Sequence, residues 1–192
     1  MANFQESYKI TMGHEGGYTN DPDDAGGETY RGISRRYNTS WEGWKIIDST
    51  KETFSDRFEE VLLRNINLVN FVESFYKSMY WDKFQGDIIS EQNIADELFD
   101  NAVNMGVNKS VTFLQQALNL LNRNQSDYED ILVDGAFGSN TIRALQKYLV
   151  VDNSSFLIKI MNILQGMHYI NYMGKDPVQE KYARGWLRRV KL

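Results

Sequence analysis

The spacing of apolar residues predicts that most of the chain is helical. Phe4, Tyr8 and Met12 recur every four positions, so they share one face of a first helix that should end near residue 15. Later stripes of helical period lie at 41–47, 68–79, 94–105, 111–121, 142–149, 157–167 and 182–190. We therefore expect a mainly α fold.

One segment, residues 16–34, interrupts the helical pattern. Gly16-Gly17 releases the backbone after the first helix, and the polar run 20–24 with Gly26-Gly27 favours turns at almost every position. The chain should fold back here as a loop or short hairpin, and Ser34 is placed to cap the next helix. The residues that indicate a brief extended stretch are Thr29, Tyr30 and Ile33. We expect a small β or irregular excursion after the first helix.

Glu15 falls on the last turn of the predicted first helix. It follows Tyr8 and Thr11 at a three-then-four spacing, which places its carboxyl group on a face that carries an aromatic ring. Poor solvation and the negative end of the helix dipole both favour the protonated form of a carboxyl group. A carboxyl group that keeps its proton is what a general acid needs. The neighbouring His14 points in a different direction, and we interpret it as a surface residue.

The loop after Glu15 carries several acids that could face it. Glycoside hydrolysis uses two carboxyl groups across a cleft: one protonates the leaving oxygen, and the other activates water or stabilises the oxocarbenium-like transition state. Asp24 is the preferred second acid, and Asp21 and Asp23 are close enough to compete for that role. The alternative is that these aspartates only form turn hydrogen bonds.

The stretch also carries a recognisable pattern. Its residues are Glu15-Gly16-Gly17-Tyr18, Asn20-Asp21-Pro22, Asp24, Gly26-Gly27, Thr29 and Gly32-Ile33. This pattern resembles the signature of the glycoside hydrolase family 108 lysozymes, a group that contains phage endolysins and secretion-associated N-acetylmuramidases. The resemblance implies a lysozyme-like helical fold with Glu15 as the catalytic acid. A broader resemblance to phage-type lysozymes implies that Asp24 and Thr29 line the water side of the cleft.

Three further residues are predicted to bind substrate. Tyr18 and Tyr30 flank the acidic loop, and Asn104 is a polar residue within an otherwise apolar segment. Asn104 either lines the sugar cleft or fastens a loop through hydrogen bonds, whereas for the nearby Asp100 we favour the fastening role.

Similar family elements occur further along the chain. They are Tyr76 with Tyr80-Trp81, the run 98–106, and Gly185-Trp186 with Arg189. The resemblance therefore covers nearly the entire chain, and it implies that the helix containing 98–106 is the buried spine of the core. Trp41 and Trp44 either stack on sugar rings or, as we favour, belong to the core.

A polar, turn-rich run at 122–127 marks the best boundary in the chain. We expect a catalytic core at 1–123 and a helical region at 124–192 packed on it. The second region opens with Val133-Asp134-Gly135, Gly138 and Thr141, a pattern that resembles peptidoglycan-binding modules, and Ser139 is a candidate helix cap.

Composition narrows the class of protein. The 192 residues, 42% of them hydrophobic, can bury one sizeable core, and the net charge of -5 argues against nucleic acid as a partner. There is no cysteine and only two histidines, so a thiolate or histidine-rich metal site is not expected. The acidic loops lack the ligand spacing of a calcium-binding EF-hand. We predict no metal and no organic cofactor.

The sequence also suggests where the protein works. Its N-terminal residues lack the basic and apolar parts of a secretory signal, and no apolar run could span a membrane. We expect synthesis in the cytoplasm, no stable membrane insertion and a monomer. Access to the cell wall would then need holin-type export, secretion or lysis.

Together these features predict a peptidoglycan hydrolase that acts on glycan strands. We expect an N-acetylmuramidase that cleaves the β-1,4 bond between N-acetylmuramic acid and N-acetylglucosamine. Glu15 would protonate the glycosidic oxygen, Asp24 would orient water or stabilise positive charge, and Thr29 would position the water. Two alternatives stay open: a lytic transglycosylase, which cleaves the same bond without water, and a non-catalytic peptidoglycan-binding or secretion-accessory protein.

Overall fold

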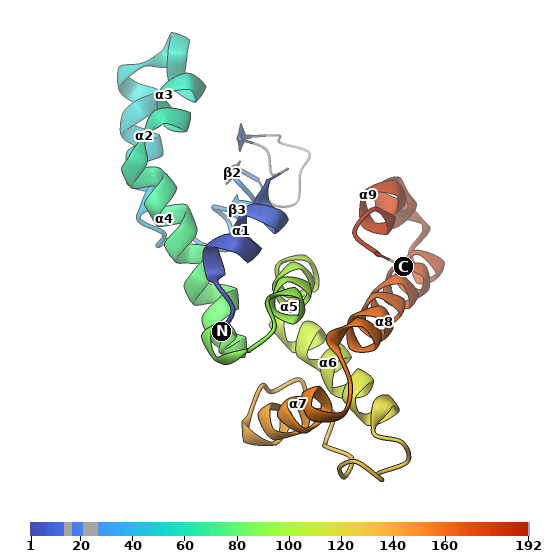
Figure 1. Ribbon diagram of the computed structural model, residues 1–192. Coiled ribbons are helices and arrows are strands. Elements are labelled where there is room, and N and C mark those ends of the chain that lie inside the picture. Colours follow the sequence, from blue (N-terminus) through green and yellow to red (C-terminus); the bar gives the residue numbers. More distant parts are fainter. Residues whose placement is uncertain (14–16, 21–26, 192) are drawn as a thin grey trace. The chain divides into compact units, whose positions relative to one another are not determined.

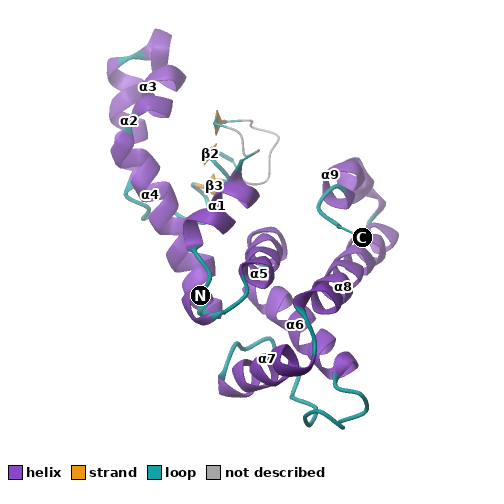
Figure 2. Cartoon of the chain, viewed as in Figure 1, coloured by secondary structure: helices purple, strands orange, loops and turns teal. Residues whose placement is uncertain are grey.

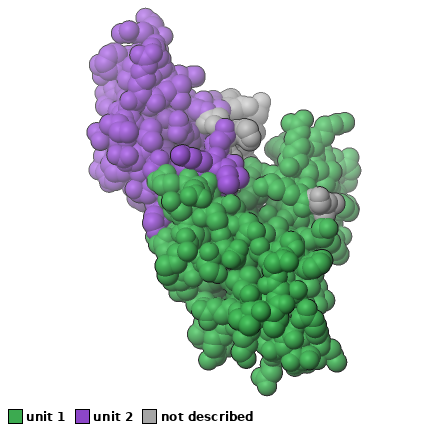
Figure 3. All heavy atoms as spheres, viewed as in Figure 1, with its two compact units in different colours: residues 1–7, 80–192 green, residues 8–79 purple. Residues whose placement is uncertain are grey.

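The computed structural model describes residues 1–13, 17–20 and 27–191. The chain divides into two compact units, Met1–Ser7 with Tyr80–Leu192 and Tyr8–Met79 (Figure 3). The described residues are mainly helical, and strands occur only between α1 and α2 (Figure 1 and Figure 2). The predicted fold class is therefore confirmed.

The elements have the following bounds. The helices are α1 Phe4–Met12, α2 Gly43–Thr53, α3 Phe58–Arg64, α4 Ile66–Tyr76, α5 Gln92–Met105, α6 Val107–Leu121, α7 Ser139–Val151, α8 Ser154–Lys175 and α9 Ala183–Leu187. The strands are β1 Tyr18–Thr19, β2 Thr29–Tyr30 and β3 Ile33–Ser34. The other helical segments are short. They are 3-10 helices at 55–57, 82–84, 86–88 and 177–182 and one π-helical turn at Lys77–Trp81.

The sheet forms where turn-favouring residues replace the helical pattern. β1 pairs antiparallel with β2, and β2 pairs antiparallel with β3, so that Tyr18 lies opposite Tyr30. Between β2 and β3 the chain reverses through Arg31 and Gly32, both in the left-handed region at φ 44° and 78°. Two consecutive left-handed residues match the right-handed twist of a two-residue hairpin. The hairpin expected from the sequence is therefore present.

The helix after the sheet begins later than the sequence predicts. Ser34 does not cap it, because Ser34 lies in β3 and α2 begins at Gly43. The main-chain oxygen of Ser34 instead accepts hydrogen bonds from the main-chain and side-chain amides of Asn38, both at 3.0 Å. On α2, Trp44 and Ile47 are buried, and the Trp44 indole Nε1 donates to the Asn38 carbonyl at 2.8 Å. Trp44 is therefore a core residue.

A π-helical turn changes which residues of the next stripe are buried. Leu68 and Val72 on α4 are fully buried, as the stripe at 68–79 predicts, but Met79 is 46% exposed. The π-helical turn adds a residue to the helical repeat and so rotates the positions that follow it. Tyr76 rather than Met79 is buried at the end of this helix.

The larger unit is built on α5, α6 and α8, which contact one another (Figure 1). Ile94, Leu98 and Ala102 on α5 are fully buried, as the apolar stripe predicts. Gly106, at φ 88°, joins α5 to α6. α8 is the longest helix at 22 residues, and no described helix is long and apolar enough to cross a bilayer.

A side chain of α6 holds the Asp134-Gly135 turn. The Gln115 amide nitrogen donates to Asp134 Oδ1 at 2.9 Å, and its oxygen accepts from the main-chain N–H of Gly135 at 2.8 Å. Gly135 has φ 73°, and a Cβ there would lie 2.2 Å from Asn108 Nδ2. Ser139 is not a cap: it is the first residue of α7, and Gly138 occupies the cap position. The boundary expected near residue 123 stays a prediction.

Candidate active site

Glu15 and Asp24, the two predicted acids, lie outside the described residues. The segments that lead to both are described, and they belong to the unit Tyr8–Met79. α1 ends at Met12, shortly before Glu15. Thr19 of β1 lies opposite Thr29 of β2, so this pair closes the loop that contains Asp24. The candidate site is therefore built from the end of α1 and the base of the β1–β2 hairpin.

A pocket of about 300 Å³ lies at the end of α1. Its lining is formed by Tyr8, Lys9, Met12, Gly13 and Arg31. The lining combines two cationic side chains with an aromatic ring, and it contains no acid among the described residues. The pocket therefore lies at the last described residues before Glu15 in the sequence.

The main chain of Arg31 is held in a defined position. Its N–H donates to the Gly17 carbonyl at 3.0 Å, and its own carbonyl accepts from the Tyr76 hydroxyl at 2.8 Å. Its φ of 44° is uncommon for a residue other than glycine, so these bonds hold a strained conformation. The guanidinium carbon lies 5.9 Å from the centre of the Tyr30 ring. The sheet therefore presents Arg31 to the pocket at the end of α1.

Glu28 ties the acidic loop to α2. Its carboxylate accepts hydrogen bonds from the Tyr18 hydroxyl at 3.0 Å, from Arg35 Nη1 at 2.9 Å and from the ammonium of Lys51. Burial alone would raise the pKa of Glu28, but the bonds from Lys51, Arg35 and Tyr18 hold that pKa below its ordinary value. Glu28 is therefore an ionised support at neutral pH and not a proton donor.

The same support extends to Asp48. Arg35 donates through both Nη1 and Nη2 to the two carboxylate oxygens of Asp48, each at 2.6 Å. This bidentate geometry gives the strongest pairing of an arginine with a carboxylate. The Asp48 bonds, outweighing the effect of burial, raise the pKa of Arg35, and Arg35 lowers the pKa of Asp48. Arg35 thus joins the base of the hairpin to α2.

Tyr18 and Thr29 both lie at the base of the acidic loop. The Tyr18 ring packs edge-on against Phe58 with centroids 4.9 Å apart, and Lys51 Nζ lies 4.6 Å from its centre. The Thr29 hydroxyl donates to the Gly27 carbonyl at 3.0 Å. That bond uses the single donor of the hydroxyl and leaves its oxygen available as an acceptor. The sequence and the structure thus place both residues beside the loop.

Tyr30 is more buried than the sequence suggests, and Asn104 is held by hydrogen bonds. Tyr30 is only 1% exposed, and its ring stacks on Trp41 at 6.4 Å, a placement that suits a supporting residue. Asn104 belongs to the other compact unit. The amide orientation that satisfies its neighbours accepts from Arg189 Nε at 2.6 Å and donates to the Tyr169 hydroxyl at 3.3 Å. Substrate binding by Tyr30 and Asn104 stays a prediction.

The chain's described part offers no candidate metal centre. No group of three or more His, Cys, Asp or Glu side chains within residues 1–13, 17–20 and 27–191 could hold a metal ion. The chemistry available at the end of α1 and the hairpin base is that of carboxyl groups, hydroxyl groups and fixed cations.

Sequence reasoning did not identify the contributions of Glu28, Arg31 and Lys51. Glu28 and Arg31 occupy positions that the family pattern leaves unspecified, and Lys51 lies on the next helix. A Thr-Tyr-Arg-Gly sequence carries no strong turn signal at arginine. Only the left-handed φ of Arg31 and the convergence of three donors on Glu28 reveal these roles.

Comparisons with known proteins identify the family and the fold. Residues 8–106 match the family described as glycosyl hydrolase 108, and residues 109–191 match one described as a predicted peptidoglycan domain. No curated protein matches the chain. The solved structure of Brucella abortus SagA is similar at 21% identity and a TM-score of 0.64, covering 97% of this chain and 88% of that one. This likeness extends over both units and shows the fold.

Proposed function

The chain belongs to the glycosyl hydrolase 108 family, and from that premise we propose that it is an N-acetylmuramidase. It would cleave the β-1,4 bond between N-acetylmuramic acid and N-acetylglucosamine in peptidoglycan. The observation that carries this proposal is the order of the two matched segments. A glycosyl hydrolase segment at 8–106, which contains both predicted acids, is followed directly by a predicted peptidoglycan domain at 109–191. Together they support a peptidoglycan hydrolase that acts on the cell wall.

In the proposed reaction Glu15 is the general acid and protonates the glycosidic oxygen. Its proton affinity reflects two opposed influences. The C-terminal end of α1 favours the protonated carboxyl group, whereas Lys9 and Arg31, which line the adjoining pocket, favour the carboxylate. A general acid must keep its proton until the leaving oxygen takes it.

Asp24 would orient the attacking water or stabilise positive charge on the sugar ring. Support for this role comes from the base of its loop. The pairing of β1 with β2 and the bonds of Tyr18, Arg35 and Lys51 to Glu28 hold both ends of the loop. A catalytic group works best when its surroundings restrict its position before the substrate arrives.

Thr29 would hold the water. Because its hydroxyl already donates to the Gly27 carbonyl, its oxygen can only accept. A water that donates one proton to Thr29 and the other to Asp24 keeps a lone pair free for attack at the sugar carbon. This arrangement favours hydrolysis, in which water is the nucleophile, over a reaction that excludes water.

The test uses purified peptidoglycan and mass spectrometry of the released ends. We expect the wild type to release reducing muramic acid ends and Glu15→Gln to lose activity by roughly a hundredfold or more, the contribution of a general acid. Glu6→Gln is the matched control, because Glu6 lies exposed on the first turn of the same helix. Anhydro ends from the wild type would assign the chain to the lytic transglycosylases.

Two other outcomes bear on the proposal. Equal activity of the wild type and Glu15→Gln would remove Glu15 from the chemistry. Binding without cleavage of every wall type tried would leave the chain as a peptidoglycan-binding or secretion-accessory protein. The export route and the monomeric state expected from the sequence remain predictions beside this proposal.

A further inference from the structure

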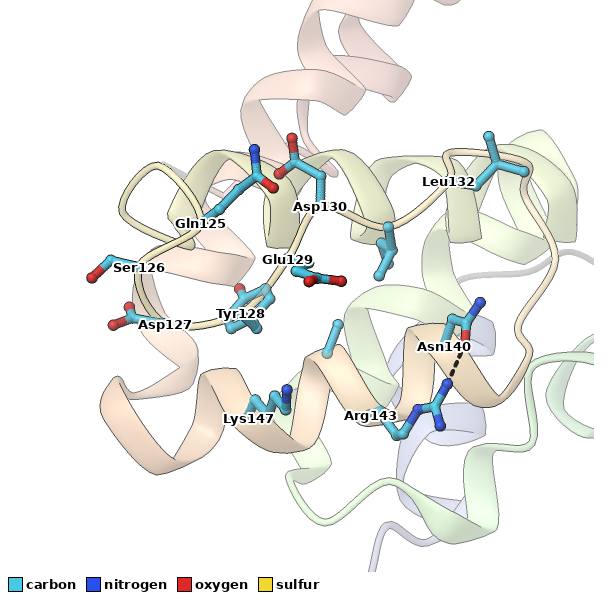
Figure 4. A pocket seen from close by; sticks show the side chains of 12 residues that line it. Gln125, Ser126, Asp127, Tyr128, Glu129, Asp130, Leu132, Asn140, Arg143 and Lys147 are labelled. Carbon is cyan, nitrogen blue, oxygen red and sulfur yellow. Dashed lines mark hydrogen bonds between the residues drawn. The ribbon is translucent and has the colours of Figure 1, made fainter.

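The C-terminal region contains a larger pocket, of about 570 Å³, whose lining includes none of the residues proposed for catalysis (Figure 4). It lies between the loop 125–132 and α7. Both walls belong to the unit that contains Tyr80–Leu192 and to the segment 109–191. Its volume falls in the range of pockets that bind small ligands, roughly 300–1,000 Å³.

One wall of this pocket is basic. Four residues of α7 line the pocket from a single helix face: Asn140, Arg143, Ala144 and Lys147. Arg143 Nη2 donates to Asn140 Oδ1 at 2.5 Å, and this bond orients the guanidinium. Neither Arg143 nor Lys147 forms an ion pair with any residue that the structure describes. Two cations therefore face the pocket without an ion-pair partner among the described residues.

The opposite wall is acidic. In Figure 4 the Glu129 carboxylate lies in the space between the loop and α7. Glu129 forms no ion pair within the described part of the chain. Asp130 accepts a hydrogen bond from Asn122 Nδ2 at 2.6 Å, and in Figure 4 its carboxylate points away from α7. Asp127, in contrast, pairs with Arg123.

The loop that forms the acidic wall is held in shape. Three consecutive residues have left-handed backbone: Arg123 at φ 52°, Asn124 at 55° and Gln125 at 64°. This conformation is unfavourable for residues other than glycine, so it persists only where the surroundings enforce it. Asn119 on α6 bonds both the N–H and the carbonyl of Ile131, at 2.9 and 2.8 Å, and the buried Tyr128 hydroxyl donates to the Leu118 carbonyl at 2.8 Å. The pocket is therefore preformed.

A preformed pocket with cations on one wall and carboxylates on the other selects a ligand that carries both charges. A neutral sugar would leave these groups without a counterpart. A polyanion would be repelled by Glu129 and Asp130, and a simple cation by Arg143 and Lys147. Peptidoglycan contains one component of the required chemistry: its stem peptide bears several carboxylates and, on its diamino acid, a free ammonium group.

We propose that this pocket binds the stem peptide of peptidoglycan. The peptide carboxylates lie on Arg143 and Lys147, and the ammonium group of the diamino acid lies on Glu129. This assignment rests on the proposed function, because it takes peptidoglycan as the substrate. It separates two tasks in one chain: the unit that contains Glu15 cleaves the glycan, and the C-terminal pocket holds the peptide.

Such a division has a kinetic consequence. A chain anchored through a stem peptide keeps its catalytic unit close to the glycan strands after each cleavage. Tethering raises the effective concentration of the next bond even when the anchoring affinity is modest. Cross-linked wall and peptide-free glycan should therefore differ as substrates for the same active site.

The test measures binding of an N-terminally acetylated stem tetrapeptide, N-acetyl-L-Ala-γ-D-Glu-meso-diaminopimelate-D-Ala, to the full chain by titration calorimetry. Its single free amine is that of the diamino acid. We expect the wild type to bind it, and we expect Arg143→Gln, Lys147→Gln and Glu129→Gln each to weaken binding by roughly tenfold. Acetylation of the free amine of the peptide should weaken binding to the wild type by a similar factor. It should have little further effect on Glu129→Gln.

Matched controls exist on the same unit. Lys159→Gln removes an exposed cation from α8, and Glu180→Gln removes an exposed acid, both outside the pocket lining. Both controls should bind the tetrapeptide like the wild type. All variants alter exposed side chains, so equal thermal unfolding temperatures would show that folding is intact.

Several results would overturn the assignment. These are no binding of the tetrapeptide by the wild type, equal binding by the wild type and the pocket variants, or no effect of amine acetylation. If a peptide-free N-acetylglucosamine tetramer bound instead, with the same sensitivity to the pocket variants, the pocket would be a glycan subsite. Release of reducing ends from peptidoglycan by the wild type is measured in parallel, so a failure of catalysis is distinguished from a failure of peptide binding.

Discussion

Arg189 Nη1 donates to the carboxylate of Asp100 at 2.7 Å and so ties the chain after α9 to the middle of α5. The Asp100 and Arg189 side chains are 20% and 27% exposed, so the pair is only partly screened by water. Asn104, one turn further along α5, contacts the same guanidinium. Two elements of the family pattern, far apart in the sequence, therefore meet at a single side chain, and the fastening role favoured for Asp100 agrees with this geometry.

Removal of this tie should destabilise the larger unit. We expect Arg189→Gln to lower the free energy of unfolding by about 1 kcal/mol, because it leaves Asp100 without its partner. In a chain of this length that loss corresponds to a drop of roughly 2–4 °C in unfolding temperature. Arg188→Gln, at the neighbouring exposed position, is the control and should change the unfolding temperature little. Equal effects from both variants in differential scanning calorimetry would contradict the assigned tie.

Glu97 makes the stability of the same unit depend on pH. Burial raises its pKa to about 7 from an ordinary value of 4.5, despite hydrogen bonds from Asn162 and Asn101. The folded chain therefore binds a proton that the unfolded chain has released between these two values. The stabilisation is complete below pH 4.5 and is lost as the pH rises to 7.

The corresponding variant is Glu97→Gln, which cannot ionise. As the pH rises from 4.5 to 8, the free energy of unfolding of Glu97→Gln should increase by roughly 3 kcal/mol relative to that of the wild type. This value follows from the difference between the two pKa values. Urea unfolding at both pH values measures this gain. Glu91→Gln, exposed at the start of α5, should show no such trend. A constant difference between Glu97→Gln and the wild type would contradict the raised pKa.

Loss of the Glu28 carboxylate should affect catalysis through the acidic loop. Glu28→Gln keeps the size of the side chain but weakens the bonds from Arg35 and Lys51. We expect several-fold slower release of reducing ends with most of the effect on kcat, since the loop position matters in the transition state. Glu52→Gln, exposed on α2, is the matched control. An unchanged rate for Glu28→Gln would show that the loop does not need this support.

Arg31 should lower the pKa of Glu15, the proposed acid. A cation in the pocket next to Glu15 favours the carboxylate, so Arg31→Met should raise the pKa of the acid and move the alkaline limb of the pH–rate profile upward. The shift should shrink at high salt if it is electrostatic. Arg57→Met, at an exposed position between α2 and α3, should leave the limb where it is. A shift of the alkaline limb of the Arg31→Met profile to lower pH would contradict this role.

Gly135 should tolerate no side chain. A Cβ at this position would lie 2.2 Å from Asn108 Nδ2 and 2.8 Å from the Asn108 main-chain oxygen, and φ is 73°. We expect Gly135→Ala to destabilise the chain by roughly 1–3 kcal/mol. Gly138→Ala, where nothing lies within 4 Å of an added Cβ, is its control. Chemical denaturation of both variants compares them directly.

The sequence predicted the parts of the fold that depend on periodicity. Ile94, Leu98 and Ala102 form a stripe that any packed helix must bury, and turn residues on both sides of the acidic run made the hairpin predictable. The π-helical turn that exposes Met79 leaves no trace in hydrophobic spacing, because it shifts the repeat by a single residue. The prediction that Ser139 caps α7 was wrong, because the helix begins at Ser139 and Gly138 occupies the N-cap position.

The candidate site was less predictable than the fold. The pattern that points to Glu15 and Asp24 is local in sequence, whereas the support around Glu28 brings Arg35 and Lys51 together from different elements. Charged residues on separate elements give no spacing signal, since their meeting depends on how α2 packs against the sheet. Such contacts become visible only in three dimensions.

The amide of Gln115 has a practical consequence for engineering. One side chain on α6 supplies both a donor and an acceptor to the Asp134-Gly135 turn, and Asn119 on the same helix does likewise for Ile131. The region proposed to bind the wall therefore depends on side chains of α6 for the shape of its turns. A graft of that region onto another enzyme should begin at residue 107, because a cut at the polar run after α6 would leave these turns without the helix that shapes them.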